Sequence, residues 1–118
     1  MTFLPKSIHD RLLANGRRQD PVRGTEDEID FHPVVKLFTP DANCTWLLTE
    51  IDPEEPNIAF GLCDLGLGFP ELGTVSLSEL ASLRGHLGLP IEVDRHFKAK
   101  KPISRYADEA AASGHIAA

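Results

Sequence analysis

The fold is decided by Cys44-Thr45-Trp46-Leu47-Leu48-Thr49-Glu50-Ile51 and by Ile58-Ala59-Phe60-Gly61-Leu62-Cys63-Asp64-Leu65. Both runs are rich in β-branched, aromatic and aliphatic residues, which is typical of strands. The Asp-Pro-Glu-Glu-Pro-Asn segment between them, residues 52–57, has the prolines and small polar residues of a turn. The two runs therefore predict two antiparallel strands joined by a short connection.

Outside this pair, Val34–Phe38 and Leu72–Leu77 predict one strand before it and one after it. Because successive connections are short, an antiparallel meander is favoured over a parallel sheet. Helices are predicted over Lys6–Asn15, after the capping box Ser76–Glu79, and over Pro102–Ser113. The expected fold class is α+β, a four-stranded antiparallel meander packed with about three short helices.

A short additional edge strand is compatible with the alternation of Ile91 and Val93 with Glu92 and Asp94. The strand register that we expect consists of the pairs Trp46 with Cys63, Leu47 with Leu62, Leu62 with Val75, and Val35 with Leu47. A slip of one residue would move every side chain of a strand to the other face.

This register gives the sheet two unlike faces. The main core face then collects large apolar residues: Val35, Leu37, Leu47, Ile51, Ile58, Phe60, Leu62, Val75 and Leu77. The second face mixes bulky and small residues: Val34, Lys36, Phe38, Cys44, Trp46, Leu48, Glu50, Ala59, Gly61, Cys63, Thr74 and Ser76. A shallow trough is expected beside Trp46, where the residues are smallest.

An apolar face of this size is uncommon on the surface of a monomer, so something should cover it. The alanine-rich helix 102–113 is the expected cover, with Ile103 and Tyr106 as anchors. The alternative is a partner protein or a second copy of the chain. The interaction surface predicted for that alternative comprises Trp46, Lys36, Phe38, Leu48, Thr74 and Ser76.

Composition and charge narrow the function classes. A chain of 118 residues fits a single domain over 1–118, with residues 19–31 expected to form a flexible acidic linker after the N-terminal helix. The net charge of −6 disfavours a general nucleic-acid binder. The C-terminal part is nevertheless basic, which keeps weak phosphate or nucleic-acid contact as a further hypothesis. Its candidate residues are Arg95, Lys98, Lys100, Lys101 and Arg105.

The two cysteines, Cys44 and Cys63, are too few for a secreted disulfide framework and are expected to be small buried thiols. No apolar run is long enough to span a bilayer, so no membrane association and a cytoplasmic location are expected. The sequence contains no Gly-rich phosphate loop, zincin helix or nucleophile elbow. No catalytic residue, metal or cofactor is therefore predicted.

A small acid/base or metal-assisted hydrolase is the alternative function. It would use Asp64, Glu71 and Glu50, together with His86 or His96. A partly desolvated carboxylate at a strand end can have a raised pKa and act as an acid or base. The hypothesis requires these groups to converge in one cleft. The more ordinary role of such a carboxylate is to cap a turn by accepting backbone amides.

Four blocks carry a resemblance to a known family: Pro33–Pro40, Thr45–Glu50, Phe60–Gly66 and Pro70–Gly73. Over about Pro33 to Tyr106 the chain resembles a family of small bacterial proteins described only as a domain of unknown function, found often on plasmids and integrative or conjugative elements. The resemblance implies a cytoplasmic bacterial accessory protein, and it supplies no catalytic residues. The function expected is a non-catalytic interaction module that binds a protein partner or a second copy of itself.

Overall fold

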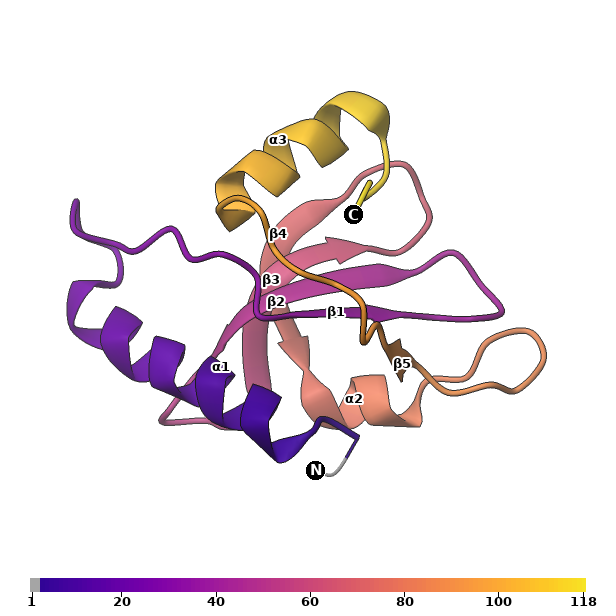
Figure 1. The fold of residues 1–118 in the computed structure, drawn as a ribbon, viewed down its shortest axis with the longest axis horizontal. Coiled ribbons are helices and arrows are strands. Elements are labelled where there is room, and N and C mark those ends of the chain that lie inside the picture. Colours follow the sequence, from indigo (N-terminus) through magenta and orange to yellow (C-terminus); the bar gives the residue numbers. More distant parts are fainter. Residues whose placement is uncertain (1–2) are drawn as a thin grey trace.

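The computed structural model describes residues 3–118 as an α+β fold with one five-stranded antiparallel sheet (Figure 1). The elements are α1 (Lys6–Gln19), the 3₁₀ turn η1 (Asp20–Val22), β1 (Val35–Phe38), β2 (Thr45–Ile51), β3 (Ile58–Asp64), β4 (Glu71–Ser76), α2 (Leu77–Ser82), β5 (Glu92–Val93) and α3 (Ile103–Ser113). The strand order is β4-β3-β2-β1-β5. The fold class is confirmed, and the four-stranded meander gains β5 as a fifth, two-residue edge strand.

The pairing of β2 with β3 is the centre of the sheet. Trp46 pairs with Cys63 and Leu47 with Leu62, as the sequence predicted. Gly61 is required at this point because a Cβ there would lie 2.0 Å from the Leu47 carbonyl oxygen. The glycine therefore lets the two central strands approach closely.

The register of the outer strands differs from the prediction. Val35 pairs with Leu48 rather than with Leu47, and Leu62 pairs with Leu72 rather than with Val75. Each shift is an odd number of residues, so the predicted faces of β1 and β4 were wrong. Val35, Leu37 and Val75 therefore share the face of Trp46.

A β-bulge lies between Leu48 and Glu50 of β2. The bulge adds one residue to the strand and reverses the alternation beyond it. Glu50 pairs with Phe60 and so leaves the face of Trp46, whereas Ile51 pairs with Ala59 and joins that face. Strand β2 itself contains no glycine or turn residue that marks the bulge, which explains why the prediction missed it.

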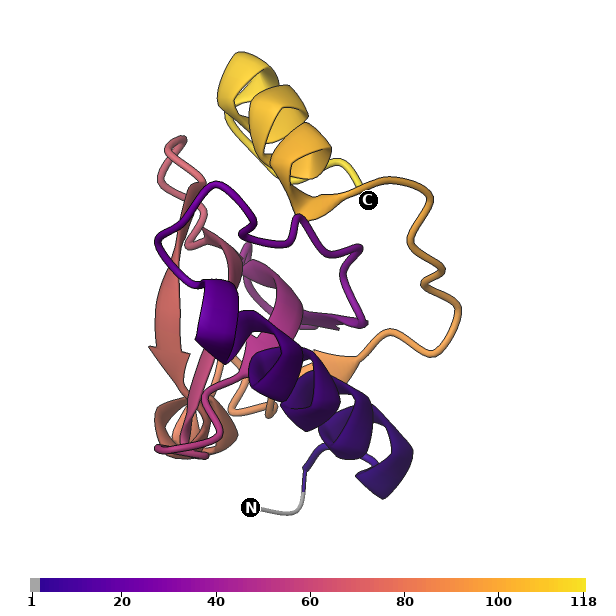
Figure 2. The same cartoon turned by 90° about the vertical axis from the view of Figure 1, so that its left-hand side faces the viewer.

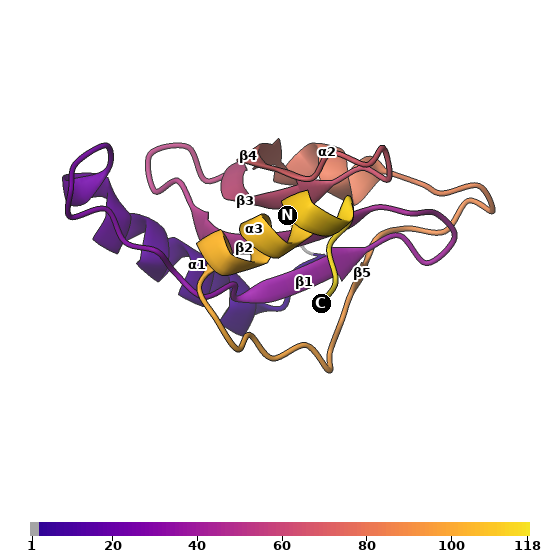
Figure 3. The same cartoon turned by 90° about the horizontal axis from the view of Figure 1, so that it is seen from above.

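The face that carries Trp46 is the main core, contrary to the prediction. Trp46 is 1% exposed and belongs to a cluster with Leu12 of α1 and Leu77 and Leu80 of α2. Helix α3 covers the opposite face, where Ile103, Tyr106 and Ala110 pack on Leu47 and Leu62. Figures 2 and 3 show α1 and α3 on opposite sides of the sheet. The prediction that the last helix covers Trp46 was wrong, because α1 and α2 already do so.

Helix α1 continues past Gly16, where the sequence predicted its end, and runs to Gln19. The side-chain amide of Gln19 donates to the Ile29 carbonyl and accepts from the Ile29 amide, both at 2.8 Å. The backbone amide of Ile103 donates to the Phe31 carbonyl at 2.8 Å. The C-terminal end of the segment predicted as a linker is thus bonded to α1 through Ile29 and to α3 through Phe31.

Candidate functional site

The six residues predicted as an interaction surface do not share one face. Leu48 is 0% exposed, and it can offer no surface to a partner. Lys36 and Phe38 lie on the face that α3 covers, since Lys36 pairs with Leu47 and Phe38 with Thr45. The Lys36 ammonium lies 3.5 Å from the Asp94 carboxylate and donates to the Ala118 carbonyl. The predicted placement of Lys36 and Phe38 on the face of Trp46 was therefore wrong. The register of β1 differs from the predicted one by one residue, and this shift moves both side chains to the opposite face of the sheet.

The other three predicted residues do come together. Trp46, Thr74 and Ser76 line a hollow of about 240 Å³ between β4 and α2, which we call the β4–α2 hollow. The buried Trp46 contributes to its floor. The rest of the lining consists of four apolar side chains and one carboxylate: Leu65, Val75, Leu80, Leu83 and Glu79.

Beside this hollow, the connection from β3 to β4 carries exposed large apolar side chains. Leu65 is 56%, Leu67 73%, Phe69 80% and Leu72 45% exposed. We call these four residues the hairpin patch. They lie within eight consecutive residues, whereas exposed apolar residues on a monomer are usually scattered singly. The sequence analysis did not single out this stretch, although Leu65-Gly66-Leu67-Gly68-Phe69 is an unusually apolar connection.

Strand β4 is an edge of the sheet and pairs with β3 alone. An edge strand presents a row of backbone amides and carbonyls that can pair with another chain. Natural edges are commonly blocked by charged residues or proline, but β4 has a single charge, Glu71, at its first position. The strand thus leaves a pairing edge next to the hairpin patch.

The acidic and histidine residues of the hydrolase hypothesis do not converge. Asp64 and Glu50 are buried in different places, while Glu71, His86 and His96 are exposed. Among five surface hollows, none is lined by more than one of these residues. Within residues 3–118 no group of three or more His, Cys, Asp or Glu side chains could hold a metal ion.

The two buried carboxylates have structural partners. Asp64 accepts from the amides of Gly66 and Ile116, each at 2.9 Å. It lines a hollow of about 620 Å³ between strand ends and the segment after α3. Glu50 lies 3.2 Å from the Arg23 guanidinium and 3.5 Å from the Gln19 side-chain amide. Both groups act as acceptors that hold loops and helices in place.

The thiols are not set up as nucleophiles. Both cysteines are free. Burial raises the pKa of Cys63 to about 11. Burial also raises the pKa of Cys44, with a smaller contribution from the nearby Asp64 carboxylate. Both side chains therefore remain protonated near neutral pH.

The basic residues of the C-terminal part are divided between two places. Lys101 pairs with Glu109 and lies 4.6 Å from the centre of the Tyr106 ring. Arg105 belongs to α3 and is exposed. Arg95, Lys98 and Lys100 lie before it in the segment that links β5 to α3. Four of the five residues thus lie in the segment between β5 and α3, and Arg105 lies on α3.

Comparison of the chain with known protein families gives a match, which covers nearly all of the fold described above. The model of the family described as "Protein of unknown function (DUF2958)" matches residues 3–117. The chain belongs to this family. No curated protein and no solved structure matches this DUF2958 chain. The resemblance inferred from the sequence is confirmed, and the match extends it to include α1 and α3 of the DUF2958 fold. Across residues 3–118 of the DUF2958 fold, no helix combines the length and the apolarity needed to cross a bilayer.

Proposed function

We propose that the chain is a non-catalytic protein-interaction module whose partner pairs with β4 and covers the hairpin patch. The observation that carries the proposal is the exposure of Leu67 (73%) and Phe69 (80%) beside an unpaired sheet edge. Strand addition at such an edge supplies backbone hydrogen bonds, and pockets for alternate side chains supply specificity. The β4–α2 hollow lies where one face of an added strand would place a side chain.

The partner is a different protein or a second copy of this chain. Self-pairing of β4 in the antiparallel sense is compatible with its charges. Glu71 is the first residue of the strand and Ser76 the last, so two copies would place their glutamates at opposite ends. Like charges would then not face each other across the pair.

The first experiment replaces the two most exposed residues of the hairpin patch. Leu67→Ser and Phe69→Ser should abolish self-association in sedimentation velocity, or the recovery of a cross-linked partner from cells of the native host. Leu87→Ser is the matched control, because Leu87 is 79% exposed but lies in the loop between α2 and β5. Loss of the same complex in Leu87→Ser would contradict a specific role for the hairpin patch.

A second variant tests the strand edge. Gly73 lies in β4, and a Cβ built there meets no atom within 4 Å. Gly73→Lys should therefore fold while placing a charge on the edge, which opposes strand addition. An unchanged complex in Gly73→Lys would separate binding by the hairpin patch from pairing along β4.

The cellular setting is part of the same proposal. Two free thiols suit a reducing compartment such as the cytoplasm. A bacterial accessory role, associated with a mobile genetic element, rests on the family resemblance of the sequence blocks. The hydrolase alternative is less favoured because its carboxylates and histidines lie apart.

A further inference from the structure

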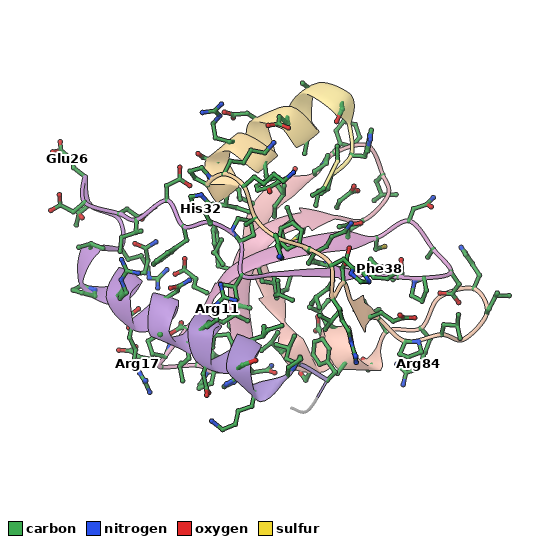
Figure 4. The ribbon with its side chains drawn as sticks, in the orientation of Figure 1. Arg11, Arg17, Glu26, His32, Phe38 and Arg84 are labelled. Atoms are coloured by element: carbon green, nitrogen blue, oxygen red, sulfur yellow. The ribbon has the colours of Figure 1, made fainter. Side chains whose placement is uncertain are left out.

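A second hollow, of about 580 Å³, lies between α1, the segment that leads into β1, and residues 97–99. Its polar lining comes from Arg11 and Asn15 of α1, His32, and Lys98. We call it the basic hollow. Figure 4 shows Arg11 and His32 in this part of the molecule, with Arg17 placed on a different side of α1. Basic residues from three distant parts of the sequence thus meet at one place.

These basic side chains have no partners of their own. Within residues 3–118, the side chains of Arg11, His32 and Lys98 form no hydrogen bond or ion pair. Four other lysines and arginines do form ion pairs with carboxylates: Lys6–Asp10, Arg23–Asp20, Lys36–Asp94 and Lys101–Glu109. Arg11 and Lys98 are therefore available to an anionic ligand, in a chain whose net charge is −6.

No carboxylate lines the basic hollow. One adjoining hollow contains Asp94 together with Arg11 and Arg95. Asp94 is already satisfied, because it accepts from the His96 amide at 2.9 Å and lies 3.5 Å from the Lys36 ammonium. These contacts, the His96 amide foremost, hold the pKa of Asp94 below its usual value.

The floor of the basic hollow is apolar. Phe31 is buried, and the Arg18 guanidinium lies 5.3 Å from the centre of its ring. The remaining apolar lining consists of Ala14, Pro33, Val34, Phe97 and Ala99. A pocket of this size with an apolar floor and a few convergent charged groups is typical of small-molecule sites. The ligand that fits it carries an anionic group and a planar or apolar body.

We propose that the basic hollow binds a phosphate monoester of about nucleotide size. Arg11 and Lys98 hold the phosphate oxygens, since guanidinium and ammonium groups donate charge-assisted hydrogen bonds to phosphate. His32 donates a further hydrogen bond, and the planar part of the ligand lies against Phe97. This site shares no residue with the hairpin patch or with β4, so it goes beyond the proposed protein interaction.

Calorimetric titration of the full chain with AMP, inorganic phosphate and adenosine tests the site. AMP should bind saturably, phosphate more weakly, and adenosine more weakly still. Arg11→Gln and Lys98→Gln should each weaken AMP binding about tenfold or more, the loss expected for one charge-assisted contact. Arg17→Gln is the matched control and should bind as the unmodified chain does. Absence of AMP and phosphate binding at millimolar concentration, or an equal loss in Arg17→Gln, overturns the proposal.

Thermal unfolding separates binding from a structural role. Without ligand, Arg11→Gln should unfold at the same or a higher temperature, because it relieves repulsion among unpaired cations. AMP should raise the unfolding temperature of the unmodified chain and of Arg17→Gln, but not that of Arg11→Gln. A lowered unfolding temperature of Arg11→Gln without ligand assigns Arg11 to structure and overturns its role.

A single-stranded oligonucleotide with a 5′-phosphate distinguishes the source of the phosphate. Binding that matches AMP and is lost in Arg11→Gln supports a site for one terminal phosphate. Affinity that increases with oligonucleotide length and persists in Arg11→Gln overturns the small-molecule site in favour of an extended nucleic-acid surface.

Discussion

At the scale of single residues, Gly16 sets how closely α1 lies on the sheet. A Cβ at this position would lie 1.8 Å from the Ile51 carbonyl oxygen, which is backbone and cannot rotate away. Glycine usually lowers the stability of a helix interior. Here that cost is offset because the helix can pack directly on the end of β2.

Gly16→Ala should therefore destabilise the fold, by about 1–3 kcal/mol, because the extra methyl group overpacks a buried contact. Gly73→Ala is the control, since its Cβ would meet open space. It should be neutral or slightly stabilising. Urea unfolding at neutral pH measures both, and equal stability of the two variants would show that α1 can shift outward without loss.

Other residue-scale expectations were partly predictable from the sequence. Asp64 stands at a strand end two residues before Gly66, and this position favours a turn-capping carboxylate. The structure shows that bond at 2.9 Å. The second partner of Asp64, the Ile116 amide, lies 52 positions away along the chain. No local pattern marks such a pair, because only the folded chain brings it together.

At the scale of elements, the Asp64 carboxylate connects the turn after β3 to the segment after α3, because it accepts from the amides of Gly66 and Ile116. Gly114 also approaches this turn, since a Cβ there would lie 3.5 Å from the Gly68 carbonyl oxygen. The two segments should therefore be stabilised together.

Asp64→Ala should lower the free energy of unfolding by about 1–3 kcal/mol, because two part-buried hydrogen bonds from backbone amides lose their acceptor. Asp64→Asn should cost less, since its carbonyl oxygen still accepts one bond. Amide hydrogen exchange followed by NMR gives the local readout. Protection of the Ile116 amide should fall in Asp64→Ala, and unchanged protection there would refute the coupling of the two segments.

Element identity was more predictable than element placement. Four strands, the capping box at Ser76 and the last helix all follow from local residue types and periodicity. Local residue types and periodicity do not determine which face of the sheet α3 covers. That face depends on the pairing of Val35 with Leu48 and on the bulge in β2, and each of these exchanges faces through a single residue.

At the scale of the whole molecule, two apolar clusters lie on opposite faces of one sheet. Trp46 belongs to the cluster beneath α1 and α2, and Tyr106 to the cluster beneath α3. The sequence contains one tryptophan and one tyrosine, so each cluster has its own spectroscopic probe. Adjacent residues of β2, Trp46 and Leu47, contribute to the two clusters, which links them through a single strand.

Unfolding should consequently be a single cooperative transition. Trp46 fluorescence, which reports the first cluster, and the aromatic circular dichroism band of Tyr106, which reports the second, should have the same midpoint in urea. Leu87→Ser is the control and should leave both midpoints unchanged, because Leu87 is 79% exposed and belongs to neither cluster. An earlier Tyr106 transition would show that α3 leaves the sheet before the main core unfolds.

The sequence by itself determined the fold class, the central pairing of β2 with β3 and the absence of any recognisable catalytic motif, because these depend on residues close together in the chain. Only the tertiary structure decided that Trp46 is enclosed, that the hairpin patch lies beside an open edge, and that Arg11, His32 and Lys98 meet. These features depend on strand register and on contacts between distant segments. Alternating patterns leave such contacts open, since a shift of one residue costs nothing locally and exchanges the two faces.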